Sequence, residues 1–133
     1  MLGLLKKRKT KGSTILIVDD EPDIRSTISL RLESKNYKVL TANNGQNGLE
    51  EAKKHHPDLI LLDTSMPVLN GHQMLEQLRS DSDIRDIPVI MVTALSDAHD
   101  IEVASSFGVS DYVTKPFNFI ELLNKIEEIL SKK

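Results

Sequence analysis

Side chains able to carry out chemistry follow four of the apolar runs in this sequence. They are Asp19, Asp20 and Glu21 after the run 14–18, Asp63 at the end of 59–63, Thr93 after 87–92, and Lys115 shortly after 109–113. Desolvating an unpaired carboxylate costs several kcal/mol or more. An Asp at the end of a buried strand therefore indicates a chemical task and not a packing role.

If the three aspartates, Asp19, Asp20 and Asp63, meet in one place, their negative charges repel one another. Two unit charges about 4 Å apart repel by roughly 4 kcal/mol at an effective dielectric near 20. A hard divalent cation relieves that repulsion, and oxygen ligands without Cys or His favour Mg²⁺. Lys115 supplies a point charge for one phosphoryl oxygen, and the Thr93 hydroxyl can donate to another. These groups predict a phosphoryl-transfer site with Asp63 as the acceptor.

The elements that must bring these side chains together alternate along the chain. Strands are predicted over 14–18, 37–42, 59–63, 87–92 and 109–113. Helices are predicted from Pro22 to near Asn36, over 46–55, around Met74, Leu75 and Leu78, over 97–107, and from Phe119 onward. Short apolar strands with helical crossovers predict an α/β fold with a parallel sheet and helices on both faces. The carboxyl ends of parallel strands share one edge, where ligands bind.

Length and charge limit the alternatives. A chain of 133 residues predicts one domain, which we assign to 13–133, preceded by a flexible basic tail at 1–12. Beyond the five basic residues of the tail, 12 basic side chains face 20 acidic ones. This excess of eight negative charges argues against direct binding of nucleic acid. Without Cys or a long apolar run, we expect no disulfide, no membrane span and a cytoplasmic location.

Five segments resemble, in the same order, the receiver domain of bacterial response regulators, the two-component signalling family that includes chemotaxis regulators. They are ILIVDDE at 15–21, LILLDTSMP at 59–67, Asn70-Gly71, Val92-Thr93-Ala94, and DYVTKPF at 111–117. The resemblance covers residues 14 to about 131. It implies a doubly wound, flavodoxin-like sheet of five strands in the order 2-1-3-4-5. It also implies a cis bond between Lys115 and Pro116.

The resemblance assigns a role to each side chain at the sheet edge. It makes Asp63 the phosphoacceptor, with Thr93 and Lys115 holding the phosphoryl oxygens. The implied Mg²⁺ ligands are Asp19, Asp20, Asp63 and the backbone carbonyl of Ser65, with Asp20 the expected direct ligand. The phosphoryl donor would be a histidine kinase or a histidine phosphotransfer protein.

A conformational switch is also implied. Tyr112 matches an aromatic residue that turns inward when Thr93 moves. Ser65 and Leu95 stand at positions that tune the lifetime of the phosphoryl group. Neither offers an acid or amide to orient water, so we expect a long-lived phosphoryl-aspartate. The expected output face spans 97–131, where a phosphorylation-dependent homodimer or a downstream target would bind.

Two other functions stay open at this stage. A phosphatase-like hydrolase can also use a strand-end Asp nucleophile, but that class resembles D-x-D, and Ser65 stands where its second Asp would be. A flavin-binding or degenerate module of the same fold is the second alternative. Three aspartates in one crevice disfavour an anionic flavin phosphate. We therefore expect a signalling switch without turnover of an external substrate.

Overall fold

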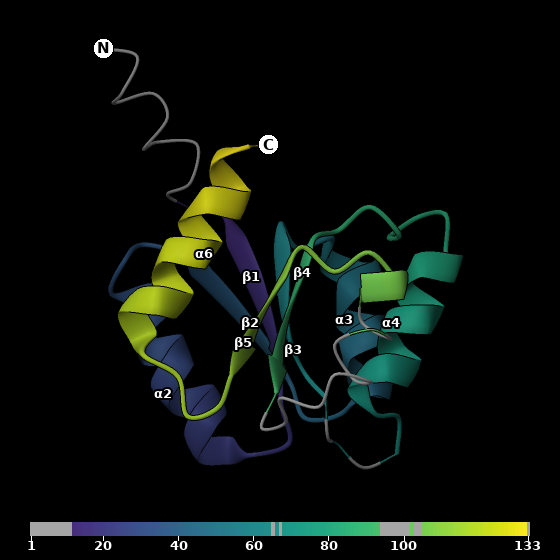
Figure 1. Ribbon diagram of the computed structural model, residues 1–133, viewed down its shortest axis with the longest axis horizontal. Helices are drawn as coiled ribbons and strands as arrows, with labels where there is room; N and C mark the ends of the chain where they lie inside the picture. Colours follow the sequence, from purple (N-terminus) through teal and green to yellow (C-terminus); the bar gives the residue numbers. More distant parts are fainter. Residues whose placement is uncertain (1–11, 65, 67, 94–101, 103–104, 133) are drawn as a thin grey trace.

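Five strands form one parallel sheet in the computed structural model, which describes residues 12–64, 66, 68–93, 102 and 105–132. They are β1 (Thr14–Val18), β2 (Lys38–Ala42), β3 (Leu59–Asp63), β4 (Val89–Thr93) and β5 (Asp111–Thr114). Their order is β2-β1-β3-β4-β5, and each neighbouring pair is parallel (Figure 1). The predicted fold class and strand order are confirmed.

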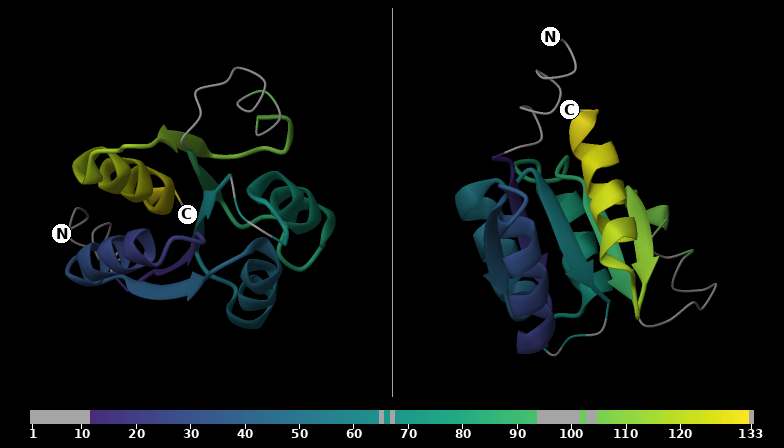
Figure 2. Two further views of the ribbon diagram at one scale, coloured as in Figure 1. Left: turned by 90° about the horizontal axis from the view of Figure 1, so that it is seen from below. Right: turned by 90° about the vertical axis from the view of Figure 1, so that its left-hand side faces the viewer.

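Helices cover both faces of the sheet. Within the described ranges they are α2 (Pro22–Glu33), α3 (Gly45–His55), α4 (Gly71–Ser80) and α6 (Phe119–Ser131). Helices α2 and α6 lie on one face, and α3 and α4 on the other (Figure 2). The predicted helix at 97–107 and the predicted tail fall largely outside the described residues. No helix in the described part of the chain is long and apolar enough to cross a bilayer.

Successive side chains of each strand enter two separate cores, because a strand alternates its side chains between the two faces of a sheet. The α2/α6 core contains Ile15, Ile17, Leu59, Leu61, Ile90, Val92 and Val113 from the strands. The α3/α4 core contains Leu16, Val18, Ile60, Leu62, Val89 and Met91. Strands β3 and β4 are buried along their whole length, as their apolar runs predict.

Two strands begin two residues later than predicted. Strand β4 starts at Val89 and not at Ile87, because Pro88 has no N–H to donate and the Ile87 N–H bonds back into the preceding turn. Strand β5 starts at Asp111 and runs to Thr114, so the prediction of 109–113 was also early. Ile87 and Val109 are apolar because they pack against the α3/α4 core from outside the strands.

Arg79, in the last turn of α4, ties three segments together. Its guanidinium donates to the carbonyls of Arg85 and Ile87 at 2.8 and 2.9 Å, and to those of Phe107 and Gly108 at 2.9 and 3.2 Å. Burial lowers the pKa of the guanidinium from its ordinary value, opposed in part by the charge of Asp86. The loop before β4 and the turn before β5 are thus fixed to the end of α4.

Candidate functional site

The alternation of the strands continues into the residues that end them. Asp19 directly follows β1, Asp63 is the last residue of β3, and Lys115 directly follows β5. Each stands two residues beyond a strand residue of the α2/α6 core, namely Ile17, Leu61 and Val113 respectively, so its side chain points to the same face of the sheet. Thr64 and Thr93 stand two residues beyond Leu62 and Met91 of the α3/α4 core, so their side chains point to the opposite face of the sheet. The three charged residues therefore emerge on one side of the sheet edge and the two threonines on the other.

Lys115 joins the acidic residues. Its Nζ lies 3.2 Å from Asp19 Oδ2, 3.4 Å from Asp63 Oδ1 and 3.5 Å from Glu21 Oε1. Asp19 and Asp63 are only 3% and 4% exposed. Burial lowers the pKa of the Lys115 ammonium, but the charges of Asp63 and Asp19 and their hydrogen bonds raise it by more, so the net pKa is above its ordinary value. Lys115 is therefore charged and neutralises part of the buried acid.

A compact acidic cluster stands at the end of β1. Asp19, Asp20 and Glu21 each offer one carboxylate oxygen within 4.8 Å of the others, with Asp19 buried and the other two exposed. Such a set of hard oxygen donors suits a divalent cation such as Mg²⁺. Glu21 was not among the predicted ligands. Asp63 was, and it connects to this cluster through Lys115; Ser65 lies outside the described residues.

Asp19 is fixed from several sides. Its N–H donates to the Ala42 carbonyl at 3.1 Å, and its Oδ1 accepts the Glu21 N–H at 2.9 Å. The Arg25 guanidinium, one turn into α2, donates to the Asp19 carbonyl at 2.7 Å. Sequence reasoning missed Arg25. The only signal was its place four residues after Glu21, where a first-turn side chain can reach back.

The end of β3 is held by the start of α4. Gly71 N–H donates to the Thr64 carbonyl at 3.2 Å, and the Gly71 Cα lies directly against the Asp63 backbone. Helix α4 begins with a capping box in which the Asn70 side chain accepts the Gln73 N–H and the Gln73 side chain accepts the Asn70 N–H. Asn70, which belongs to one of the segments that carry the resemblance, thus starts a well-capped helix.

The two threonines are bonded to each other. The Thr64 hydroxyl donates to the Thr93 hydroxyl oxygen at 3.0 Å. Thr93 is 4% exposed, and its carbonyl accepts the Lys115 N–H at 2.6 Å. Tyr112, the predicted switch residue, is 39% exposed on β5. The Lys115–Pro116 bond is cis, as the resemblance implies.

Comparison of the sequence with known protein families and relatives agrees with this arrangement of side chains. Residues 15–127 match the response regulator receiver domain. The chain belongs to that family. This receiver domain is 39% identical over 119 residues to the response regulator ArlR of Staphylococcus aureus and 40% identical over 118 residues to the probable transcriptional regulator ycf27 of Porphyridium aerugineum. The matches cover 90% and 89% of this chain but 53% and 48% of the relatives, so the chain spans about half their length.

Solved structures resemble the receiver domain over nearly its whole length. The chemotaxis protein CheY4 of Vibrio cholerae matches with a TM-score of 0.83 and 30% identity, covering 88% of this chain and 98% of that one. The receiver domain of the sensor histidine kinase PA1611 of Pseudomonas aeruginosa, with a magnesium ion coordinated in its active site cleft, matches with a TM-score of 0.82 and 31% identity, covering 90% and 98%. The relatives include both response regulators and receiver domains of sensor kinases, which places this receiver domain in two-component signalling.

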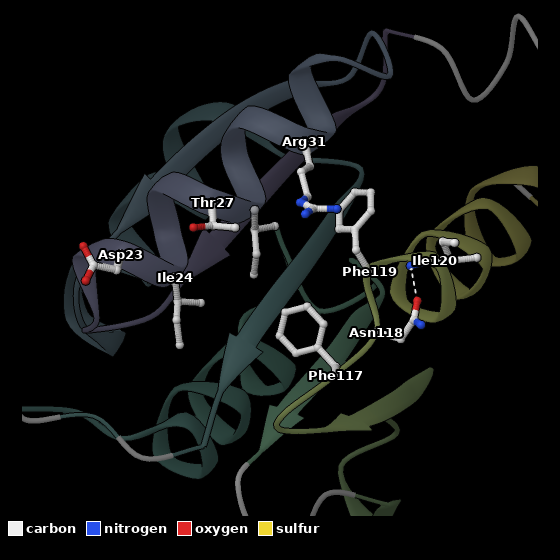
Figure 3. Close-up of a pocket in the computed structure, with 9 residues that line it drawn as sticks. Asp23, Ile24, Thr27, Arg31, Phe117, Asn118, Phe119 and Ile120 are labelled. Atoms are coloured by element: carbon white, nitrogen blue, oxygen red, sulfur yellow. Dashed lines mark hydrogen bonds between the residues drawn. The ribbon is translucent and has the colours of Figure 1, made fainter.

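An apolar groove lies between α2 and the start of α6 of the receiver domain. It has a volume of about 540 Å³ and is lined by Ile24 and Ile28 of α2, by Phe117 just before α6 and by Phe119 at its start. Figure 3 shows Ile24, Phe117 and Phe119 between the two helices. The Arg31 guanidinium lies 5.2 Å from the centre of the Phe119 ring, a cation–π contact between the two helices. The groove is lined by none of the three clustered carboxylates, so it is a separate feature of the α2/α6 face.

Proposed function

We propose that Asp63 accepts a phosphoryl group and that the domain switches its output face in response. The observation that carries the proposal is the position of Lys115, a half-buried cation within 3.4 Å of both Asp19 and Asp63 at the carboxyl edge of a parallel sheet. Two nearly buried carboxylates that share one ammonium are costly to maintain for stability alone. They suit a site in which a further anionic group must be held.

The residues fit a bound Mg²⁺. Asp19, Asp20 and Glu21 present carboxylate oxygens close together, and Asp20 and Glu21 are open to solvent. Asp19 and Asp20 would hold the ion, with Asp63 and the Ser65 carbonyl completing the protein ligands. When bound, Mg²⁺ neutralises charge on the phosphoryl oxygens and draws the reacting groups together.

The chain's own residues orient the transfer. An Asp63 carboxylate oxygen forms the new P–O bond while the N–P bond of a phosphohistidine donor breaks, and the released imidazole takes up a proton. The Lys115 ammonium, already beside Asp63, compensates the charge that arrives. Thr93 supplies a hydroxyl donor for a second phosphoryl oxygen. The phosphoryl group adds about 1.5 to 2 negative charges next to Lys115 and Thr93, which gives the switch its driving force.

The wider context follows from the same assignment. The donor would be a histidine kinase or phosphotransfer protein, and the output would pass through 97–131 to a homodimer or a downstream target, with Tyr112 turning inward. We propose that the domain occupies 13–133 behind a basic tail, works in the cytoplasm and turns over no external substrate. Without an acid or amide at Ser65 or Leu95, the phosphoryl-aspartate should be long-lived.

Mass spectrometry of the intact protein tests the proposal. Incubation with a small phosphodonor and Mg²⁺ should add one phosphoryl group to the wild type and none to Asp63→Ala. Asp83→Ala is the matched control, because Asp83 is an exposed carboxylate that pairs with His56 well away from the site. Equal uptake by Asp63→Ala, no uptake by the wild type, or steady turnover of a phosphate ester would reject the assignment.

A further inference from the structure

The hydrogen bond between Thr64 and Thr93 is a feature that the proposed reaction does not use. Thr64 directly follows Asp63, and its N–H continues the pairing of β3 with β4 by donating to the Val92 carbonyl at 3.3 Å. Its hydroxyl then reaches the Thr93 hydroxyl at 3.0 Å. Thr64 is half-buried, whereas Thr93 is almost completely buried.

This bond lies on the side of the sheet away from the Asp63 carboxylate. Asp63 pairs with Val92 in the sheet, so the next pair along the strands is Thr64 with Thr93, whose side chains emerge on the side of the α3/α4 core. The Asp63 carboxylate lies on the other side, against Lys115. With its hydroxyl bonded to Thr64, Thr93 is held on the side of the sheet opposite to the carboxylate.

We propose that Thr64 is a positioning residue that holds Thr93 in the unphosphorylated orientation and so sets how readily the domain switches. This inference rests on the proposed function, in which Thr93 binds a phosphoryl oxygen. The Thr64 bond must break when Thr93 turns, and water can then solvate the half-buried Thr64 hydroxyl. An interaction present in only one of two states shifts the equilibrium toward that state.

Replacing Thr64 with Val tests this with little change in shape. Val keeps the branched side chain but has no hydroxyl, so it removes a bond from the unphosphorylated state alone. Losing one such bond should tighten the apparent affinity for beryllium fluoride, a phosphoryl mimic measured in the presence of Mg²⁺, by about two- to tenfold. Thr64→Ser keeps the hydroxyl and should bind like the wild type. Thr64→Ala serves as a second variant without a hydroxyl.

A double-mutant cycle separates this role from general packing. Thr93→Val removes the other partner, so Thr64→Val should have no effect on mimic affinity in that background. Weaker or unchanged binding by Thr64→Val, or equal tightening by Thr64→Ser, would overturn the role of Thr64 alone. Mimic binding that survives Asp63→Ala would instead overturn the proposed function, and the role of Thr64 with it.

Discussion

Replacing Gly71 with Ala should destabilise the receiver domain through the backbone that carries Asp63. A Cβ at Gly71 would lie 2.2 Å from the Asp63 carbonyl oxygen, 2.8 Å from Thr64 Cα and 3.0 Å from the Asp63 carbonyl carbon. Ordinary contacts begin near 3.4 Å, and the three nearest atoms that it would meet all belong to the main chain. No side chain can rotate away, so β3 and the start of α4 must separate.

The size of the effect follows from this geometry. Forcing an extra methyl into a packed interior costs about 1–3 kcal/mol. The same separation stretches the Gly71–Thr64 hydrogen bond, already 3.2 Å long. We expect the free energy of unfolding to fall by about 1–3 kcal/mol, and phosphoryl uptake to fall because the Asp63 carboxylate is displaced from Lys115.

Gly48 provides a matched control. A Cβ there would lie 2.9 Å from both Cε and Sδ of Met74 and 3.0 Å from Val18 Cγ2. Met is flexible and can give way, and Ala favours the interior of α3 by up to about 1 kcal/mol over Gly. Urea denaturation followed by circular dichroism should therefore show less than about 1 kcal/mol of change for Gly48→Ala. Finding Gly71→Ala as stable as Gly48→Ala would refute the reasoning.

Two further predictions concern the carboxyl end of α4. Arg79 lies in its last turn, and Asp81 is its C-cap residue. Arg79→Met leaves four backbone carbonyls without the guanidinium donor and should lower the free energy of unfolding by about 2–4 kcal/mol. Arg79→Lys should restore only part of this loss. Chemical denaturation would measure both effects. The Asp83 N–H and then the Lys53 ammonium lower the pKa of Asp81, so its contribution to stability is present above its ordinary pKa and is lost as pH falls through the lowered folded value. The stability difference between wild type and Asp81→Asn should be full at pH 6 and shrink below about pH 4; a difference that is constant or grows in acid would contradict this.

Much of the fold and the proximity of the charged residues could be predicted because both follow from strand periodicity. Four of the five strands share one pattern, an apolar run that ends in a polar group, and parallel pairing brings these ends to one edge. Asp19, Asp63 and Lys115 also point to the same face of the sheet. This could be predicted, because each stands two residues after a strand residue that points to that face. Strand starts were less predictable, because Ile87 and Val109 are apolar for reasons of packing outside the sheet.

Arg25 and Arg79 could not be predicted, and the reason is physical. Both side chains donate to backbone carbonyls, and a carbonyl is the same for every residue type. Such contacts leave no pattern of paired residue types in the sequence. The bond between Thr64 and Thr93 was missed for a different reason, since it depends on the pairing of Asp63 with Val92, which is fixed only once the sheet forms.

The phase of the strands also limits how the length of this chain can vary. One residue inserted or deleted within β3 would exchange Asp63 and Thr64 between the two sides of the sheet. The β3 side chains on one side of the insertion or deletion would also move from one face of the sheet to the other. An insertion in the exposed segments at the amino edge of the sheet, such as 34–36 or 82–83, leaves that phase intact. Variation in length should therefore accumulate in these connections, because a shift in register within a strand would move the site residues at its end to the wrong side of the sheet.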